Sequence, residues 1–154
     1  MRIVFVCWGN ICRSPMGERV ARRWFDGAGL GHVDITSAGV SSEEHGNPID
    51  RRAQRVLAAN GYTTGGHRAH RITPQEIEDA DLVLGFEELH LARMRRLAPT
   101  ASHLCLVTDF DPHAVPGSGI DDPWYGGPEG FEATLGAIES AMPGIIAWAC
   151  ERRK

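Results

Sequence analysis

The stretch from Ile3 to Pro15, IVFVCWGNICRSP, decides the fold. Its first five residues, Ile3–Cys7, form a short apolar run of the kind found in strands that are buried inside a sheet. Ser14 suits the N-cap of a helix, and Pro15 suits the first helical position, where its missing N–H costs nothing. The stretch therefore predicts a strand, a tight loop and a helix, with Cys7 at the carboxyl end of the strand.

The remainder of the chain repeats this alternation of short apolar runs and longer helical patterns. The alternation predicts a single α/β domain over residues 1–154, a doubly wound sheet of four parallel strands flanked by helices. Ligands of such sheets bind beyond the carboxyl ends of the strands. The expected strands are Ile3–Cys7, Val33–Ser37, Leu82–Phe86 and Leu104–Val107; the expected helices are Pro15–Asp26, Asp50–Asn60, one through Leu89–Leu97 and one from near Pro128, with a kink or a fresh start at Pro143-Gly144.

The composition is that of an ordinary globular protein, and its charge is modest. The 154 residues include 16 Lys and Arg against 20 Asp and Glu, which gives a formal charge of −4, so we expect no nucleic-acid partner. The N-terminal apolar run ends at Trp8, too early for a signal sequence or a membrane span, so we expect no membrane insertion. The four cysteines contain no C-x-x-C pair, and we expect a cytoplasmic protein without structural disulfides.

The loop between the first strand and the first helix is suited to bind a phosphate group. Gly9 and Asn10 tolerate the positive φ that a tight loop needs, and such a loop can turn its amides inward beside a helix N-terminus. Arg13 adds a planar fork that can hold two phosphate oxygens. The same positive field favours the thiolate form of Cys7. The alternative is a buried Cys7 that acts only as a small apolar residue, and Arg13, six residues later, argues against it.

The whole string from Val6 to Pro15, V-C-x-G-N-I-C-R-S-P, resembles the C-x5-R-[ST] signature of the low-molecular-weight protein tyrosine phosphatase family. The resemblance covers nearly the whole chain, with further matches at 36–39 (TSAG), 46–48 (GNP), 66–69 (GHRA) and 122–125 (DPWY). It implies a hydrolase that cleaves phosphotyrosine and aryl phosphates through a cysteinyl-phosphate, without a cofactor. We expect a monomer whose partners are phosphotyrosine-containing proteins.

The resemblance also implies three catalytic roles. Cys7 corresponds to the nucleophile, Arg13 to the phosphate-binding arginine, and Asp122 to the general acid that protonates the leaving phenolate. An acid is needed because an unprotonated phenolate leaves slowly near neutral pH, and repulsion from Asp121 would help to keep Asp122 protonated. Asp111 is a rival because a proline follows it too, but only the motif at Asp122 continues with two aromatic residues and a glycine pair.

The other expected site residues bind the substrate or support the loop. The resemblance places Trp8, Trp124 and Tyr125 around the pocket mouth, where they suit the ring of phosphotyrosine. It assigns loop support to Asn10, Ser37 and His67, and stabilisation of the leaving thiolate to Ser14, although a turn hydroxyl explains Ser37 equally well. The expected substrate-binding residues are Trp8, Gly9, Asn10, Ile11, Cys12, Ser14, Trp124 and Tyr125.

Two histidines raise the question of a metal site. His67 and His70 lack Cys or carboxylate partners at ligand spacing, so we expect no metal. His70 stands where the family motif H-x-A-R has Arg, Glu43 stands where an aromatic residue often lines the cleft, and Trp8 stands where a smaller side chain is usual. These departures bear on substrate preference rather than on the reaction.

Three other functions compete with tyrosine phosphatase activity as interpretations of this loop. Arsenate reductases of the same fold use two more cysteines near the third strand, and residues 70–95 contain none. Protein-arginine phosphatases tend to carry Thr where this chain has Ile11. A non-catalytic phosphate-binding module would need neither Cys7 nor Asp122, because amides and Arg13 suffice for binding. Tyrosine phosphatase activity is therefore the favoured prediction.

The second cysteine of the loop suggests control by oxidation. A reactive thiolate in an open pocket is exposed to peroxide, and a neighbouring thiol can trap the oxidised form as a disulfide. Cys12 lies five residues after Cys7, close enough for such a bond if the loop curls round a phosphate. The alternative is that Cys12 only packs against the core.

Overall fold

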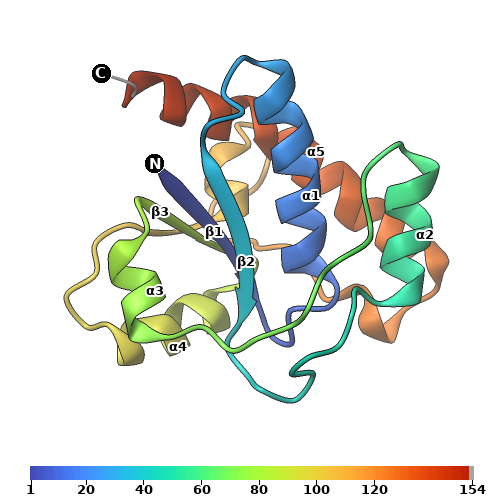
Figure 1. Ribbon diagram of the computed structural model, residues 1–154, viewed down its shortest axis with the longest axis horizontal. Helices are drawn as coiled ribbons and strands as arrows, with labels where there is room; N and C mark the ends of the chain where they lie inside the picture. Colours follow the sequence, from blue (N-terminus) through green and yellow to red (C-terminus); the bar gives the residue numbers. More distant parts are fainter. Residues whose placement is uncertain (153–154) are drawn as a thin grey trace.

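The computed structural model describes residues 1–152, and its centre is one parallel sheet (Figure 1). The strand order is β2-β1-β3-β4, with every neighbouring pair parallel. This arrangement confirms the predicted four-stranded doubly wound sheet. The strands are β1 (Arg2–Cys7), β2 (Asp34–Gly39), β3 (Leu82–Gly85) and β4 (Leu104–Leu106).

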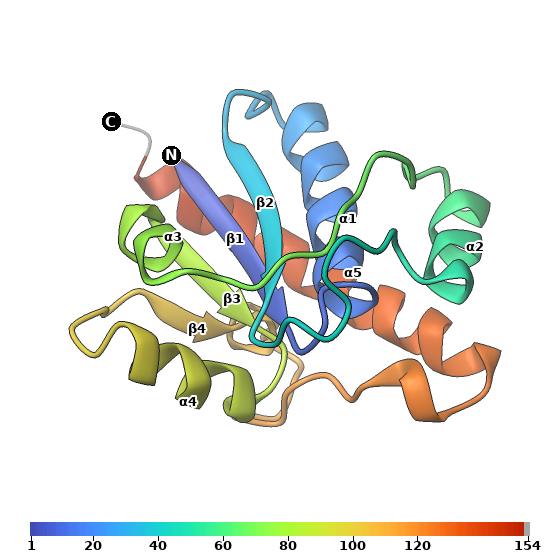
Figure 2. The same cartoon turned by 60° about the horizontal axis from the view of Figure 1, so that its bottom comes forward.

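Helices cover both faces of the sheet, as Figures 1 and 2 show. One face, with Ile3 and Phe5 of β1, packs against α1 and α5. The other face, with Val4 and Val6, packs against α3 and α4. Because β1 lies inside the sheet and is covered on both sides, these four side chains are at most 1% exposed, which explains the continuous apolar run. The helices are α1 (Arg13–Gly27), α2 (Arg51–Ala59), α3 (Pro74–Asp79), α4 (Glu88–Leu97) and α5 (Pro128–Glu151), and two short 3-10 turns are η1 (Val107–Phe110) and η2 (Pro123–Tyr125).

The expected start of the first helix is wrong by two residues. Helix α1 begins at Arg13, with Cys12 at the N-cap position, and Ser14 is inside the first turn. Ser14 therefore does not cap the helix; its hydroxyl contacts the sulfur of Cys7. The capping preference of serine misled the prediction, because here the side chain has a partner in the loop that precedes the helix.

Two other features differ from the expected elements. Helix α3 was not predicted; it is short, and it begins with a capping box between Thr73 and Glu76. No new helix starts at Pro143-Gly144, because α5 continues through the proline. Met142 and Ile145 are completely buried, so tertiary packing holds the helix across the hydrogen bond that proline lacks.

Helix α5 is also the one helix of the described chain that is long and apolar enough to cross a membrane. Its apolar residues have another explanation, since Phe131, Leu135, Ile138 and Met142 pack against the core shared with α1 and β1. The fold thus uses α5 as its central core helix.

Candidate active site

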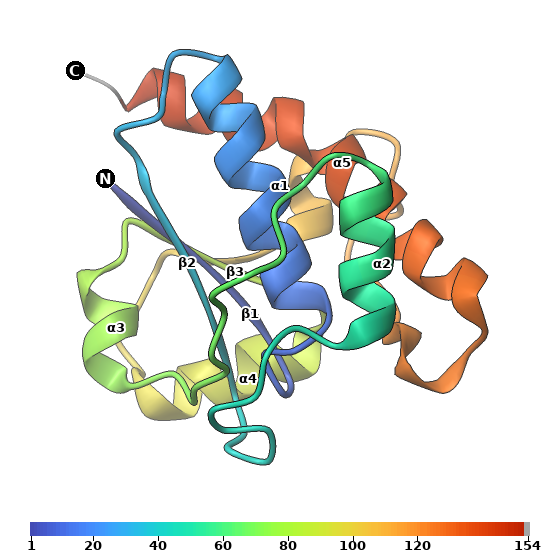
Figure 3. The same ribbon diagram turned by 45° about the vertical axis from the view of Figure 1, so that its right-hand side comes forward.

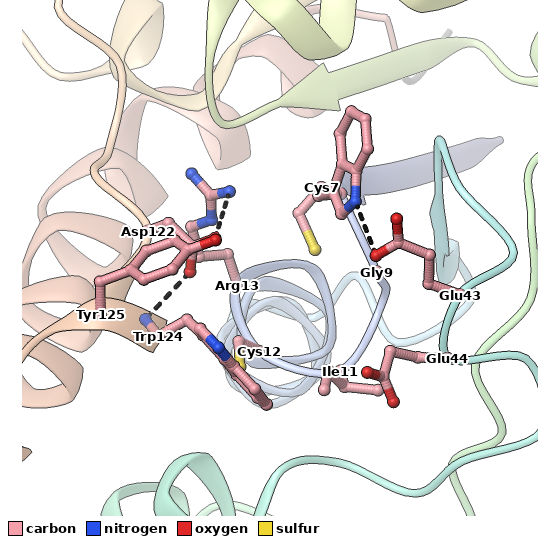
Figure 4. A pocket seen from close by; sticks show the side chains of 11 residues that line it. Cys7, Gly9, Ile11, Cys12, Arg13, Glu43, Glu44, Asp122, Trp124 and Tyr125 are labelled. Carbon is pink, nitrogen blue, oxygen red and sulfur yellow. Dashed lines mark hydrogen bonds and ion pairs between the residues drawn. The ribbon is translucent and has the colours of Figure 1, made fainter.

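A cleft of about 180 Å³ opens at the carboxyl end of β1, where parallel α/β sheets bind their ligands. Figure 4 shows Cys7 and Arg13 at the cleft, with Glu43 on one side and Asp122, Trp124 and Tyr125 on the other. The lining residues are Cys7, Trp8, Gly9, Ile11, Cys12, Arg13, Glu43, Glu44, Asp122, Trp124 and Tyr125. Of the expected substrate-binding residues, only Asn10 and Ser14 do not line the cleft; both are fully buried behind the loop.

Asn10 holds the loop in shape from behind. It is the one non-glycine residue of the described chain with a positive φ, 62°, whereas Gly9 does not take this conformation. Its side-chain amide donates to Oγ of Ser14 (2.8 Å) and to Oγ of Ser37 (3.0 Å), and its Oδ1 accepts the amide hydrogen of His70 (3.1 Å). Asparagine tolerates the left-handed conformation, and these three bonds fix it there.

Two more contacts support the loop from neighbouring segments. Nε2 of His67 lies 2.6 Å from the carbonyl oxygen of Asn10, and because a carbonyl only accepts, this nitrogen carries the hydrogen. Burial lowers the pKa of His67, which keeps the ring neutral. At the end of β2, a Cβ on Gly39 would lie 2.7 Å from the carbonyl oxygen of Trp8, so only glycine lets the strand approach the loop this closely.

The sulfur of Cys7 has two polar neighbours, both from Ser14. Sγ lies 3.0 Å from the hydroxyl oxygen of Ser14 and 3.3 Å from its backbone nitrogen. The hydroxyl oxygen already accepts from Asn10, so its own hydrogen is available to the sulfur. Ser37 in turn donates to the buried carboxylate of Glu18 at 3.0 Å. The donors therefore diverge from the side-chain amide of Asn10, in one direction through Ser37 to the carboxylate of Glu18 and in the other through Ser14 to the sulfur of Cys7.

Arg13 is almost completely buried, with 2% of its side chain exposed, and one of its terminal nitrogens is fully occupied. Nη1 donates to Oε2 of Glu87 and to the carbonyl oxygen of Ile120, both at 2.8 Å. Nη2 lies 3.5 Å from Oδ2 of Asp122. The Nε–Nη2 edge of the guanidinium is thus the edge left to bind an anion in the cleft.

Glu87 and His90, behind Arg13, are site residues that the sequence reasoning missed. His90 is completely buried, and burial together with the charge of Arg13 lowers its pKa to about 3. Its Nδ1 accepts the amide hydrogens of Phe86 and Glu87. The neutral ring therefore fixes the backbone of the turn between β3 and α4. The sequence did contain a signal for Glu87, because this residue directly follows the predicted third strand, at the edge of the sheet where ligands bind.

Asp122, not its rival Asp111, is the aspartate that reaches the cleft. Its Oδ1 accepts the amide hydrogen of Trp124 at 3.0 Å, which leaves Oδ2 directed at Arg13. Asp111 lies in a separate turn, where its carboxylate accepts the amide hydrogen of His113 at 2.9 Å. Because a proline follows each aspartate, that proline alone did not distinguish the two candidates. Their positions in the fold distinguish them.

Aromatic side chains flank the entrance. Nε1 of Trp8 donates to Oε2 of Glu43 at 3.2 Å, and the guanidinium of Arg93 lies 4.7 Å from the centre of the Trp8 ring. Trp124 and Tyr125, on the opposite side, are 42% and 88% exposed. The three aromatic residues predicted at the mouth are therefore brought together, with Trp8 held from two sides and Tyr125 almost free.

Cys12 lines the same cleft as Cys7 and is 6% exposed. Burial, with smaller contributions from the charges of Asp50 and Cys7, raises the pKa of Cys12, so it remains a thiol near neutral pH. All four cysteines are free. No group of three or more His, Cys, Asp or Glu within residues 1–152 is arranged to hold a metal ion, and His70 instead contacts Glu76 at 2.8 Å.

The fold and the cleft define an α/β protein with an anion-binding loop at the end of β1. The family model described as low molecular weight phosphotyrosine protein phosphatase matches residues 2–153. The chain therefore belongs to this family of phosphoric monoester hydrolases, as the sequence predicted.

Individual relatives agree with the family assignment. The chain is 43% identical to a low molecular weight protein-tyrosine-phosphatase of Streptomyces coelicolor over 152 residues, covering 95% of this chain and 92% of the relative. It is 38% identical to low molecular weight protein-tyrosine phosphatase A of Mycobacterium tuberculosis, covering 99% and 93%. Among solved structures, a protein tyrosine phosphatase from Entamoeba histolytica superimposes with a TM-score of 0.93 at 25% identity, covering 100% of this chain and 99% of that one.

Proposed function

We propose that the protein hydrolyses phosphotyrosine in proteins, with Cys7 as nucleophile, Arg13 as phosphate ligand and Asp122 as general acid. One observation supports this assignment above the others. The sulfur of Cys7, the free edge of Arg13 and the free oxygen of Asp122 converge on one cleft that aromatic side chains flank.

The first step forms a bond between sulfur and phosphorus. The Cys7 thiolate attacks the phosphorus of the substrate, and the loop amides with the Nε–Nη2 edge of Arg13 bind the equatorial oxygens. The bond from phosphorus to the phenolic oxygen breaks, and Asp122 transfers its proton to that oxygen. Ser14 donates its hydroxyl hydrogen and its amide hydrogen to the sulfur, which favours the thiolate both before attack and when it leaves.

The second step returns the enzyme to its starting state. A water molecule attacks the phosphorus of the cysteinyl-phosphate while Asp122, now a carboxylate, accepts one of its protons. The sulfur–phosphorus bond breaks, inorganic phosphate leaves, and the Cys7 thiolate is restored. No atom of a metal ion or cofactor takes part in either step.

The shape of the cleft favours an aromatic phosphoester. Cys7 is 3% exposed and lies below the level of Trp124 and Tyr125, so the phosphate must be carried on a group long enough to pass them. A tyrosine ring meets that need and fits between aromatic walls, whereas phosphoserine is too short. Ile11 also lines the cleft, where it offers an apolar surface to the ring rather than a hydrogen bond to a guanidinium.

The test of this function is a comparison of substrates. Purified protein should hydrolyse phenyl phosphate and a phosphotyrosine peptide, with little release of phosphate from phosphoarginine and no reduction of arsenate in the presence of thiols. Preferred hydrolysis of phosphoarginine would replace the tyrosine assignment, and phosphate binding without hydrolysis of any substrate would show a binding module.

We also propose that Cys12 protects Cys7 from irreversible oxidation in a reducing compartment, the cytoplasm. Peroxide converts the Cys7 thiolate to a sulfenic acid, and the Cys12 thiol then displaces water to form a disulfide. A thiol reductant then supplies two electrons, which reduce the disulfide and restore both thiols. The support is that both cysteines line one small cleft, while Cys105 lies on β4 and Cys150 near the end of α5.

A further inference from the structure

The side chain of Arg52, on α2, contacts the segment that carries Asp122 in two ways and the first turns of α5 in a third. Its Nη1 donates to the carbonyl oxygen of Trp124 at 3.2 Å. Its guanidinium carbon also lies 4.8 Å from the centre of the Trp124 ring and 4.8 Å from the centre of the Phe131 ring. Arg52 therefore holds both the backbone and a side chain next to Asp122, and Figure 3 shows α2 beside the segment that leads into α5.

Asp50 fixes the orientation of this guanidinium. Its Oδ1 lies 3.1 Å from Nε of Arg52 and its Oδ2 lies 3.3 Å from Nη2, a two-point contact. The same Oδ1 accepts the backbone amide hydrogen of Arg52 and so caps α2. The backbone amide of Asp50 donates to the carbonyl oxygen of Ile11 at 2.8 Å. A continuous set of hydrogen bonds thus runs from the phosphate-binding loop through Asp50 and Arg52 to Trp124.

Apart from Arg52, the segment around Asp122 is anchored at its start by Ile120, which bonds to Phe86 and Arg13, and by the buried Pro123. Among the described residues, the bond from Arg52 is the one hydrogen bond that reaches the backbone of residues 121–126 from outside that segment. The other bonds there are internal, such as those from the amide of Trp124 to Asp122 and from the amide of Gly126 to Pro123. The remaining polar contact is the 3.5 Å approach of Asp122 to Arg13, and a bound phosphate would compete for the same edge of that guanidinium.

We propose that Arg52 is a positioning residue that keeps Asp122 within proton-transfer reach of the leaving group. The proposal rests on the proposed role of Asp122 as general acid. When the phosphate occupies the edge of Arg13, the bond and the ring contacts from Arg52 still define where the acid segment lies. Because Asp50 bonds both to Arg52 and to the carbonyl oxygen of Ile11, the acid segment is tied to the phosphate-binding loop through α2.

The experiment measures kcat and kcat/KM for a series of aryl phosphates in which the leaving phenol ranges from para-nitrophenol to phenol. Arg52→Met removes the hydrogen bonds and the charge but keeps an unbranched apolar side chain. It should lower kcat for phenyl phosphate about tenfold and change it much less for para-nitrophenyl phosphate, because a displaced acid matters most when the leaving group is poor. The dependence of log kcat on the pKa of the phenol should therefore become steeper.

Three controls keep the result interpretable. Arg55→Met changes an exposed arginine one turn later on α2 and should behave as wild type. The inhibition constant of inorganic phosphate should stay within about twofold of wild type in Arg52→Met, because the anion-binding loop is intact. Arg52→Lys keeps the charge without the planar fork that serves Asp50 and Trp124 together, and it should also steepen the dependence.

Two outcomes would overturn the proposal. The first is that both Arg52 variants keep the wild-type dependence on the leaving group while Asp122→Asn steepens it, which would leave the acid assignment intact. The second is that Asp122→Asn itself does not steepen the dependence, which would show that the acid assignment has failed and the positioning role with it. A loss of kcat/KM in Arg52→Met that is equal for all leaving groups belongs to the first outcome, because kcat/KM covers only the steps up to the departure of the phenol.

Discussion

The loop of Cys7 and the segment of Asp122 face each other across one cleft, but they are held very differently. The cysteine loop is fixed from two other parts of the chain, by the buried hydroxyl of Ser37 and by the His67 ring and the His70 backbone amide, and Asn10 at its centre is fully buried. The acid segment 121–126 is held mainly by its own internal bonds and by Arg52, and it carries the highly exposed Tyr125. The difference indicates a preformed anion site that meets a more adaptable acid and substrate wall.

The largest effect should come from the nucleophile itself. Cys7→Ser should abolish turnover of phenyl phosphate, because a hydroxyl is far less nucleophilic than a thiolate near neutral pH. The variant should still bind inorganic phosphate, since the loop and Arg13 remain, and wild-type activity should be insensitive to a chelator. Steady-state kinetics and phosphate titration check both points. Near-native turnover in Cys7→Ser, or inhibition by a chelator, would contradict the mechanism.

The next largest effect tests the acid segment. Asp122→Asn should lower kcat about 10²–10⁴-fold for poor leaving groups, because the phenolate then departs unprotonated. The loss should be much smaller for para-nitrophenyl phosphate. Asp111→Asn is the matched control and should leave the rates unchanged, since Asp111 does not line the cleft. A loss of kcat/KM that is equal for all leaving groups would assign Asp122 a structural role instead, because kcat/KM covers only the steps up to the departure of the phenol.

Stability should separate the two regions. Asn10→Ala removes three hydrogen bonds, two of them buried, and places alanine at a φ of 62°, so it should lower the free energy of unfolding by about 2–4 kcal/mol. Trp124→Ala, in the exposed segment, should cost less than about 1 kcal/mol and mainly raise KM. Urea denaturation measures both variants. Similar losses would mean that the acid segment is as firmly held as the cysteine loop.

Oxidation offers a smaller and reversible effect within the cysteine loop. After treatment with peroxide and then dithiothreitol, wild type should recover most of its activity and show a Cys7–Cys12 linkage before reduction. Cys12→Ser should recover at least about fivefold less activity than wild type, because a sulfenic acid without a thiol partner is oxidised further to irreversible forms. Cys105→Ser is the matched control on β4. Equal recovery of Cys12→Ser and wild type would show that Cys12 has no protective role.

Much of the cysteine loop could be predicted from the sequence, because its chemistry is local. Residues 7–13 contain the nucleophile, the amides and the arginine in one continuous run, so neither long-range pairing nor register had to be guessed. The alternating apolar runs were sufficient for the sheet, since strands buried on both faces leave a strong signal. The start of α1 was misplaced because Ser14 has a tertiary partner that no local preference reveals.

The support of the site was harder to predict because its partners are distant in the chain. Arg13 contacts Glu87 and Ile120, which lie 74 and 107 residues away, and Arg52 contacts Trp124 across 72 residues. Charged residues at helix starts and strand ends are common, so nothing in their local sequence distinguishes Arg52 from Arg51 or Arg55. Only the fold shows which arginine faces the acid segment.

The smallest expected effect concerns a partly exposed contact behind the cysteine loop, that of His70 with Glu76. The amide of His70 donates to Asn10, and its ring contacts the carboxylate of Glu76 at 2.8 Å. The hydrogen bond to Glu76 raises the pKa of His70 above 6.5, its ordinary value. A raised pKa means that this contribution to stability is complete below about pH 6.5 and is lost as the pH rises through the pKa of the folded state. The His70 side chain is 40% exposed, so the contribution should stay below about 1 kcal/mol.

His70→Gln should therefore be destabilised relative to wild type at about pH 5.5 and equal to it at about pH 9, because the ion pair exists only while the imidazole is protonated. The opposite influence of His67, whose pKa is lowered by burial, is present in both proteins and cancels in the difference. His32→Gln, at an exposed position, is the control and should show no such dependence on pH. Urea denaturation across this range measures the difference. If the difference is the same at both pH values, the pair with Glu76 adds nothing, and the backbone amide of His70 is the whole of its contribution to the loop.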